Sequence, residues 1–529
     1  MSKTLFRRAL GASSALFIFL GALAWGAQPR YGGALIYGKP RDAVGLDPHN
    51  VTDGESFDVT QMIFDTLVRY KEGKTEVEPA LAVSWRVSKG GQEWTFQLRK
   101  GVRFHDGTPF DANAVVFSFE RQMYRDHPYH QGSFEYWPSI FGGYPGIVRK
   151  VKATGRHTVT FLLQSPSAPF LLNLAMPSNA ILSPEAVKKY GQDFFKHPVG
   201  TGPFRFIEWI SNERIVLQAN EAYWGGKPYL RELIYRPIPE NAVRLLELEK
   251  GSIDAMHGIN PDDAERIKRN RNLILHTQPG LNVGYLAFNT ERKPFDDKRV
   301  RQALNMAVDK ETLVRALFRG YGVAAKNPTP PIMWGYNDGV KSYSYDPRQA
   351  RMLLAQAGYP NGFKTTLWAM PVARPYMPDP KKMAEALQEY FRAIGVEARI
   401  ISYDWGTYLE KTSQGEHDMM LLGWTGDNGD PDNFLYTLLS SDAAIKGSAN
   451  NRAFYRNQEL DTILKRAQRA FDRRERAKLY QKAQAIFHED APWIPLVHAV
   501  QLGVTGSHVK GYQLHPTGIH RFDKVWIEE

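Results

Sequence analysis

A short loop rich in glycine and aspartate carries the residue types best suited to bind a charged group. Residues 423–433 read Gly-Trp-Thr-Gly-Asp-Asn-Gly-Asp-Pro-Asp-Asn, so Asp427, Asp430 and Asp432 lie within six positions. Carboxylates this close repel one another unless cations or amide donors compensate them. The interspersed glycines let the backbone approach another group closely or adopt positive φ. The loop therefore needs a partner for its charge.

Three interpretations of this loop compete. Asp432 or Asn433 is well suited to cap the helix predicted to follow, because both residue types are preferred at helix N-termini. A calcium loop is disfavoured, because counting from Asp427 puts a glycine at position 3 and a leucine at position 12. In the third interpretation, Asp427 receives a cationic ligand group, such as an α-ammonium, beside the aromatic wall of Trp424.

A second loop offers the opposite charge. Residues 370–376 read Met-Pro-Val-Ala-Arg-Pro-Tyr, which presents Arg374 stiffly next to a proline. The planar guanidinium fits a carboxylate with two parallel hydrogen bonds. The alternative is a surface ion pair of little energetic value.

Strands and helices must position both loops. An apolar strand over 419–422 precedes the first loop and an amphipathic helix follows it, while a strand over 365–370 precedes the second loop. From residue 283 onward, strands and helices alternate, which predicts βαβ units over a largely parallel sheet with ligands at the strands' C-terminal ends. Both loops would then open on one crevice.

The chain before residue 280 has a different pattern. A strand at 33–38 is followed by a loop and by a helix that starts near 52–58. Period-two alternation over 82–87, 92–99 and 158–163 predicts an antiparallel insertion. We place a domain boundary near residue 280.

Composition and the first residues limit the function. The chain has 529 residues, 43% of them hydrophobic, which suffices for large cores. Residues 1–27 combine basic residues, an apolar run and small residues, which predicts a cleaved export signal. With no cysteine, the chain can form no disulfide and has no lipid-attachment thiol, so we expect a periplasmic protein without an anchor. Loss of the signal lowers the net charge from +11 to +8, and neither that charge nor export favours nucleic acid as a partner.

In sequence, the chain resembles the family-5 extracellular solute-binding proteins of ABC importers, and among them the periplasmic dipeptide-binding proteins in particular. Six segments carry the resemblance, namely 101–121, 199–204, 279–285, 299–304, 368–376 and 423–433. It implies an α/β fold of two lobes that close like a clamshell. Lobe I would comprise 28–280 plus 498–529, with an inserted subdomain over roughly 66–195, and lobe II would comprise 281–497.

The resemblance also implies roles for individual residues. The α-ammonium of a peptide would meet Asp427 and its α-carboxylate would meet Arg374, with Tyr376 and Trp424 as walls. Other expected contacts are the loop residues Gly423, Thr425 and Gly426, and Gly54, Glu55 and Ser56 from the first lobe. No catalytic residue, metal ligand or cofactor is expected.

The function implied is that of a monomeric, non-enzymatic component that captures small peptides, above all dipeptides, and delivers them to permease subunits in the inner membrane. The same fold with haem, glutathione, an oligopeptide or a nickel chelate as cargo is the alternative. An exported hydrolase is a further alternative, although no nucleophile elbow or metal-binding pair of histidines supports it.

Overall fold

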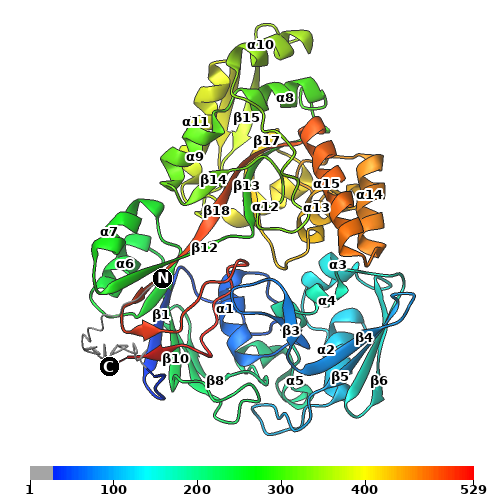
Figure 1. Cartoon of the computed structure of the whole chain (residues 1–529), viewed down its shortest axis with the longest axis vertical. Coiled ribbons are helices and arrows are strands. Elements are labelled where there is room, and N and C mark those ends of the chain that lie inside the picture. Colours follow the sequence, from blue (N-terminus) through cyan, green and yellow to red (C-terminus); the bar gives the residue numbers. More distant parts are fainter. Residues whose placement is uncertain (1–27, 529) are drawn as a thin grey trace, which may run out of the picture.

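The computed structural model describes residues 28–528, which form two lobes (Figure 1). Lobe II lies at the top of Figure 1 and lobe I below it. The strand β18 (Trp493–Gly506) belongs to both lobes: residues 493–499 pair with β13 (Asn282–Phe288) and β14 (Gly322–Ala324), and residues 500–506 pair with β11 (Ala255–His257) and β12 (Leu273–Pro279). The chain thus crosses between the lobes at the β12–β13 connection and again within β18.

Lobe I is built on the N-terminal strand. β1 (Ala34–Lys39) lies parallel to both β10 (Glu232–Pro237) and β11. Antiparallel neighbours β9 (Arg214–Ala219) and β8 (Phe204–Ile210) complete this part of the sheet. Its helices are α1 (Gly54–Ile63), α5 (Pro184–Tyr190), α6 (Asn241–Glu249) and α7 (Ala264–Arg269), and the tail adds β19 (Val509–Lys510) and β20 (Trp526–Ile527).

The antiparallel pairing predicted for the strands at 82–87, 92–99 and 158–163 is confirmed, and the strand-rich region that contains them is called the insertion below. Its four-stranded sheet has the order β4 (Ala82–Val87), β5 (Glu93–Leu98), β7 (Thr158–Leu163) and β6 (Val148–Gly155), with every pair antiparallel. Around it lie α2 (Ala112–Met123), α3 (Tyr136–Phe141), α4 (Phe170–Asn173) and the hairpin of β2 (Val68–Tyr70) with β3 (Val77–Pro79). Its apolar core draws on residues between Leu67 and Ile181.

Lobe II contains the expected βαβ units but not a largely parallel sheet. β15 (Phe363–Trp368) is parallel to β16 (Val396–Ile401) and to β17 (Met419–Thr425), whereas β13 is antiparallel to both β17 and β18. That prediction was wrong because β13 and β18 enter and leave the lobe in opposite directions. The helices are α8 (Lys298–Met306), α9 (Lys310–Phe318), α10 (Pro347–Gln356), α11 (Pro380–Arg392), α12 (Trp405–Gln414), α13 (Asp432–Leu439), α14 (Gln458–Arg469) and α15 (Arg473–Asp490).

Each lobe has its own apolar core. The core of lobe II draws only on residues between Leu281 and Ala499, and a core of lobe I combines the N-terminal region with the tail up to Val525. Separate cores make each lobe a rigid unit, so movement between the lobes requires only the two crossings to bend. The export signal predicted at 1–27 lies outside the described residues.

Candidate functional site

The loop between β17 and α13 is fixed at both ends. β17 pairs with β13 up to the partners Thr425 and Asn282, and the Gly426 amide then donates a 2.7 Å hydrogen bond to the Leu281 carbonyl. A side chain at 426 would come within 2.6 Å of the Phe434 ring, so the backbone lies directly on the helix that follows. The loop is therefore held rigidly on the core of lobe II.

Asp427 is held by neutral donors. Its Oδ1 accepts a 3.0 Å hydrogen bond from the Tyr136 hydroxyl, its Oδ2 accepts a 3.1 Å bond from the Asn433 side-chain amide, and its own amide donates to Asn433 Oδ1 at 3.0 Å. The Tyr70 hydroxyl donates to its carbonyl at 3.2 Å. Burial raises the pKa of Asp427, and the bonds from Asn433 and Tyr136 partly offset this rise. Within residues 28–528 no Lys, Arg or His forms an ion pair with this carboxylate.

The two neighbouring aspartates have structural partners instead. Asp430 is fully buried and pairs with Arg476 at 2.7 Å, while Asp432 accepts a 3.2 Å bond from Gln468. Asp430 also accepts the backbone amide of Asp432 at 3.0 Å, so it, and not Asp432 or Asn433, satisfies the start of α13. The three carboxylates do not converge as calcium ligands would. Of the three, Asp430 alone forms an ion pair with another described residue, and Asp427 is the one whose carboxylate accepts a hydrogen bond from lobe I.

Asn433 connects the predicted aromatic wall to the carboxylate. Its Oδ1 accepts hydrogen bonds from Trp424 Nε1 at 2.9 Å and from the Asp427 amide, and its Nδ2 donates to Asp427. Trp424 and Asp427 are thereby fixed relative to each other. The sequence suggested Asn433 only as a helix cap, because nothing in its spacing distinguishes a cap from a side chain that turns back into the loop.

The second loop, after β15, presents Arg374 in a tight turn. The Arg374 and Met377 backbones exchange hydrogen bonds of 3.0 and 2.8 Å. The guanidinium lies over the ring of Trp405, 4.8 Å from its centroid, and burial lowers the pKa of Arg374. In the part of the chain that the structure describes, no carboxylate lies within ion-pair distance of it. The surface ion pair considered from the sequence is therefore not what holds Arg374, and Trp405 is a contact that the sequence did not indicate.

Tyr376 joins the two loops. Gly284 and Gly423 are direct partners in the β13–β17 pairing, and a Cβ at Gly423 would lie 2.2 Å from the Tyr376 ring. A Cβ at Gly284 would lie 2.6 Å from the Tyr376 carbonyl. The glycine pair thus makes room for the Arg374 turn against β17, the strand that leads into the Asp427 loop. Tyr376 is buried, which raises its pKa to about 12.

The lobe I residues predicted for the site lie in the first turn of α1. Asp53 caps this helix by accepting the Ser56 amide at 2.9 Å, and Gly54 is its first residue. The Glu55 carboxylate lies 3.6 Å from Lys39 Nζ and 3.7 Å from His257 Nε2, and the closeness of His257 and then Lys39 lowers its pKa to about 2 despite burial.

Ser56 is fully buried, and its Oγ accepts the Val44 amide at 3.0 Å. The negative charges of Glu55 and Asp53 nevertheless reach the second loop, where they partly offset the lowering of the Arg374 pKa by burial. Of the three predicted lobe I residues, Glu55 therefore has the clearest electrostatic connection to the lobe II loops.

The two lobes touch around Asp427. Besides the contacts of Tyr136 and Tyr70, the Asn428 amide donates a 2.8 Å bond to Asn173 Oδ1, and the Ala168 amide donates a 2.7 Å bond to the Gln468 carbonyl. These lobe I partners all come from the insertion. The structure is therefore closed over the first loop.

A cavity lies elsewhere in lobe I. Its volume is about 90 Å³, and its lining includes Asp65, Arg69, His515 and Arg521 but none of the predicted contact residues. Tyr70, which donates to the Asp427 carbonyl, also lines this cavity. It is therefore not the site predicted from the sequence.

The comparisons with known proteins agree with this architecture. Residues 76–446 match the model of the bacterial extracellular solute-binding proteins, family 5. The chain is 42% identical to the dipeptide-binding protein of Escherichia coli over 93% of this chain and 94% of that one, and 40% identical to heme-binding protein A of Haemophilus influenzae over 93% and 92%.

A solved structure extends the agreement to three dimensions. The ABC transporter-associated periplasmic binding protein DppA of Helicobacter pylori, in complex with peptide STSA, superposes with a TM-score of 0.85 at 40% identity, over 95% of this chain and 99% of that one. Across residues 28–528, no helix has the length and apolar character needed to cross a membrane. The chain belongs to family 5 of the bacterial extracellular solute-binding proteins and has their two-lobed fold.

Proposed function

We propose that this protein binds short peptides, above all dipeptides, between its lobes and presents them to the permease of an ABC importer. The observation that carries the proposal is the half-buried carboxylate of Asp427, which accepts side-chain hydrogen bonds from the neutral donors Tyr136 and Asn433. A buried carboxylate is stabilised when a cation pairs with it. A peptide α-ammonium supplies that cation together with three N–H donors, and it fits a site already oriented by Asn433.

Arg374 serves the other end of the peptide. Its guanidinium lies over the ring of Trp405, a contact that positions the group before a carboxylate arrives. Asp427 and Arg374 stand on two loops that Tyr376 holds together, which makes their separation a fixed length. Each added residue lengthens an extended peptide by about 3.3 to 3.6 Å, so such a pair selects peptides by length.

The remaining predicted residues complete the site. Trp424 and Tyr376 act as walls, and Gly423, Thr425 and Gly426 bring the backbone at the end of β17 and the start of the loop close to the peptide. Gly54, Glu55 and Ser56 contribute the lobe I side, with the Glu55 charge near Arg374 opposing a second anion there. Closure of the lobes over the peptide changes the outer surface that the permease subunits in the inner membrane would recognise.

The proposal includes the setting of the protein. We place it in the periplasm as an exported monomer that releases its peptide unchanged, since capture by paired charges requires no catalytic group. Incubation of the protein with Ala-Ala and analysis by mass spectrometry tests the last point: recovery of free alanine would indicate a hydrolase.

Calorimetric titration tests peptide capture. Ligand-stripped protein is titrated with Ala-Ala, Ala-Ala-Ala and N-acetyl-Ala-Ala, and the series is repeated on Asp427→Asn with the exposed Asp126→Asn as control. We expect Ala-Ala to bind and N-acetyl-Ala-Ala to lose at least about tenfold in affinity, because stranding one charge of a buried pair costs about 2 to 5 kcal/mol. Equal affinities for Ala-Ala and its acetylated form would show that Asp427 does not receive an ammonium.

Haem is the second candidate, because one relative at 40% identity is a heme-binding protein. Absorbance titration with haemin decides between the two cargoes. A Soret shift that saturates at one haem per chain, in protein that gives no heat with any peptide, would replace the peptide proposal. Glutathione, longer peptides and a nickel chelate are screened in the same way.

A further inference from the structure

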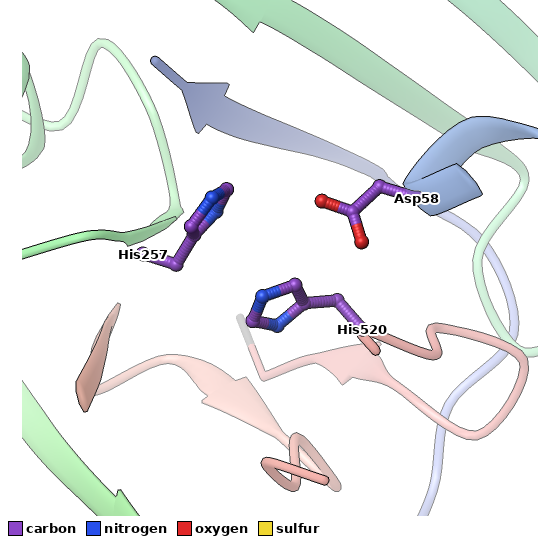
Figure 2. Close-up of side chains that lie close together, drawn as sticks. All are labelled: Asp58, His257 and His520. Atoms are coloured by element: carbon purple, nitrogen blue, oxygen red, sulfur yellow. The ribbon is translucent and has the colours of Figure 1, made fainter. Parts of the chain in front are cut away.

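Two histidines and an aspartate converge inside lobe I, apart from the loops of lobe II. Asp58 comes from α1, His257 from β11 and His520 from the C-terminal tail, and Figure 2 shows the Asp58 carboxylate directed toward the two imidazoles. One potential metal-ligating atom from each residue lies within 4.8 Å of the others. The two rings stack with centroids 4.7 Å apart. Nitrogen and oxygen donors from α1, β11 and the C-terminal tail, which are far apart in the sequence, thus lie close together.

Both rings are held by tyrosines through the same nitrogen. The Tyr37 hydroxyl lies 2.7 Å from His257 Nδ1, and the Tyr512 hydroxyl lies 2.9 Å from His520 Nδ1. When each Nδ1–H donates to its tyrosine oxygen, both Nε2 atoms keep a free lone pair. Metal-binding histidines show this arrangement, since a hydrogen bond at one nitrogen orients the ring and makes the other a better ligand.

The charges around the cluster allow an added cation. Lys39, which is fully buried, donates to the Glu55 carbonyl and lies 3.6 Å from Glu55 Oε2, so these two side chains form a neutral pair. The other carboxylate oxygen, Oε1, lies 3.7 Å from His257 Nε2. Glu55 Oε2 is buried and accepts no hydrogen bond from the described residues. Asp58 then remains as the carboxylate that balances a metal ion.

We propose that Asp58, His257 and His520 form a binding site for one divalent transition-metal ion of the zinc and nickel class. Two imidazoles with one carboxylate suit these metals, whereas calcium and magnesium prefer oxygen donors alone. Metal–ligand distances of about 2.0 to 2.2 Å keep any two ligand atoms within about 4.4 Å of each other. The three ligand atoms, all within 4.8 Å of one another, are thus close to the spacing that one ion requires.

The proposed metal site uses none of the residues proposed for peptide capture, although both sites draw on α1. Asp58 and Glu55 share α1, whose first turn contributes the lobe I residues proposed for the peptide site. A metal ion at Asp58 would fix the tail residue His520 to this helix. Metal binding at these three residues therefore does not depend on which ligand binds between the lobes.

Metal titration of the mature protein tests the proposal. Protein treated with EDTA and dialysed is titrated with zinc chloride and with nickel chloride by calorimetry, and with cobalt chloride by visible absorption. We expect saturation at one ion per chain, together with cobalt d–d bands. Absence of both heat and bands would overturn the site.

Variants separate this site from surface histidines. His520→Gln and Asp58→Asn should each weaken metal binding by more than about 100-fold, and Tyr512→Phe by about 10- to 100-fold, because it removes only the supporting hydrogen bond. The exposed His197→Gln should bind as the wild type does. Unchanged binding in His520→Gln and Asp58→Asn would assign the ion to the surface.

A measurement on the wild type keeps the test independent of whether the variants fold. X-ray absorption of the nickel-loaded protein should show two imidazole ligands among nitrogen and oxygen neighbours. A spectrum with no imidazole or a single one would contradict the site.

Discussion

The Tyr136 hydroxyl of lobe I donates a 3.0 Å hydrogen bond to Asp427 Oδ1 of lobe II. The insertion that carries Tyr136 thereby touches the carboxylate that we propose for the peptide ammonium. The Asp427 carboxylate would thus take part both in the contact between the lobes and in pairing with the ligand. Ligand binding and lobe closure should therefore stabilise each other.

Tyr136→Phe should weaken binding of Ala-Ala. The variant loses a hydrogen bond to a charged carboxylate, which is worth about 1.5 to 3 kcal/mol, or roughly 10- to 150-fold in affinity. Calorimetry measures the change, with the exposed Tyr31→Phe as control. Small-angle scattering of the ligand-loaded variant should also show a larger population of open molecules. An affinity equal to that of the wild type would mean that Tyr136 takes no part in closure over the ligand.

Arg374→Lys should reduce affinity for Ala-Ala although it keeps the positive charge. The lysine ammonium cannot reproduce the planar fork stacked on Trp405 or bind a carboxylate through two parallel bonds. We expect at least about a tenfold loss, since one charge-assisted hydrogen bond is worth about 1.5 to 3 kcal/mol.

The control for Arg374→Lys is a second ligand and not a second variant. Alanyl-alaninamide lacks the α-carboxylate, so its weaker binding should be almost the same in the wild type and in Arg374→Lys. If the variant loses equal factors for both ligands, Arg374 acts on something other than the carboxylate.

Gly423→Ala should disturb the site and the fold together. The new Cβ would lie 2.2 Å from the Tyr376 ring and 2.6 Å from the Val283 carbonyl, so the Arg374 turn has to move. Overpacking of this kind costs about 1 to 3 kcal/mol in the free energy of unfolding. Urea denaturation measures the loss, and Gly90→Ala, where the nearest atom is 3.8 Å away, is the control. Wild-type stability and affinity in Gly423→Ala would show that the turn is not held against β17.

The sequence predicted the loops of lobe II better than the contacts between the lobes. Asp427 and Arg374 each follow a strand that is easily recognised by its apolar residues. Because β15 and β17 are neighbouring parallel strands, the loops at their ends lie close together. Trp405 was missed because a tryptophan at a helix start has no signal that distinguishes a stacking partner from a core residue.

The contacts of Tyr70 and Tyr136 with the first loop could not be predicted from the sequence for another reason. Both belong to the insertion, whose position over the first loop depends on how far the lobes close. The degree of closure depends on the whole interface between the lobes and not on any local pattern in the sequence. The antiparallel direction of β13 was missed likewise, because alternation of strands and helices indicates a βαβ unit but says nothing of a strand that enters from the other lobe.

Asp432→Asn should stabilise the protein at neutral and higher pH. Burial, and then the charge of Asp430, raises the pKa of Asp432 from 3.8 to about 7, so the folded protein holds a proton that the unfolded chain releases between about pH 4 and 7. The stabilisation from this proton is complete below about pH 4 and is lost as pH rises through about 7. Asparagine never carries the charge, so the variant should gain about 1 to 3 kcal/mol at pH 8 and little at pH 4.

Urea unfolding at a series of pH values from 4 to 8 tests this expectation. The stability difference between Asp432→Asn and the wild type should grow from about pH 4 to about pH 7 and then level off, because the Asp432 charge develops beside Asp430 while Arg476 is already paired with Asp430. The exposed Asp126→Asn should show no such trend. A difference that is constant with pH would mean that Asp432 is ionised throughout and that Gln468 and Arg476 together compensate its charge.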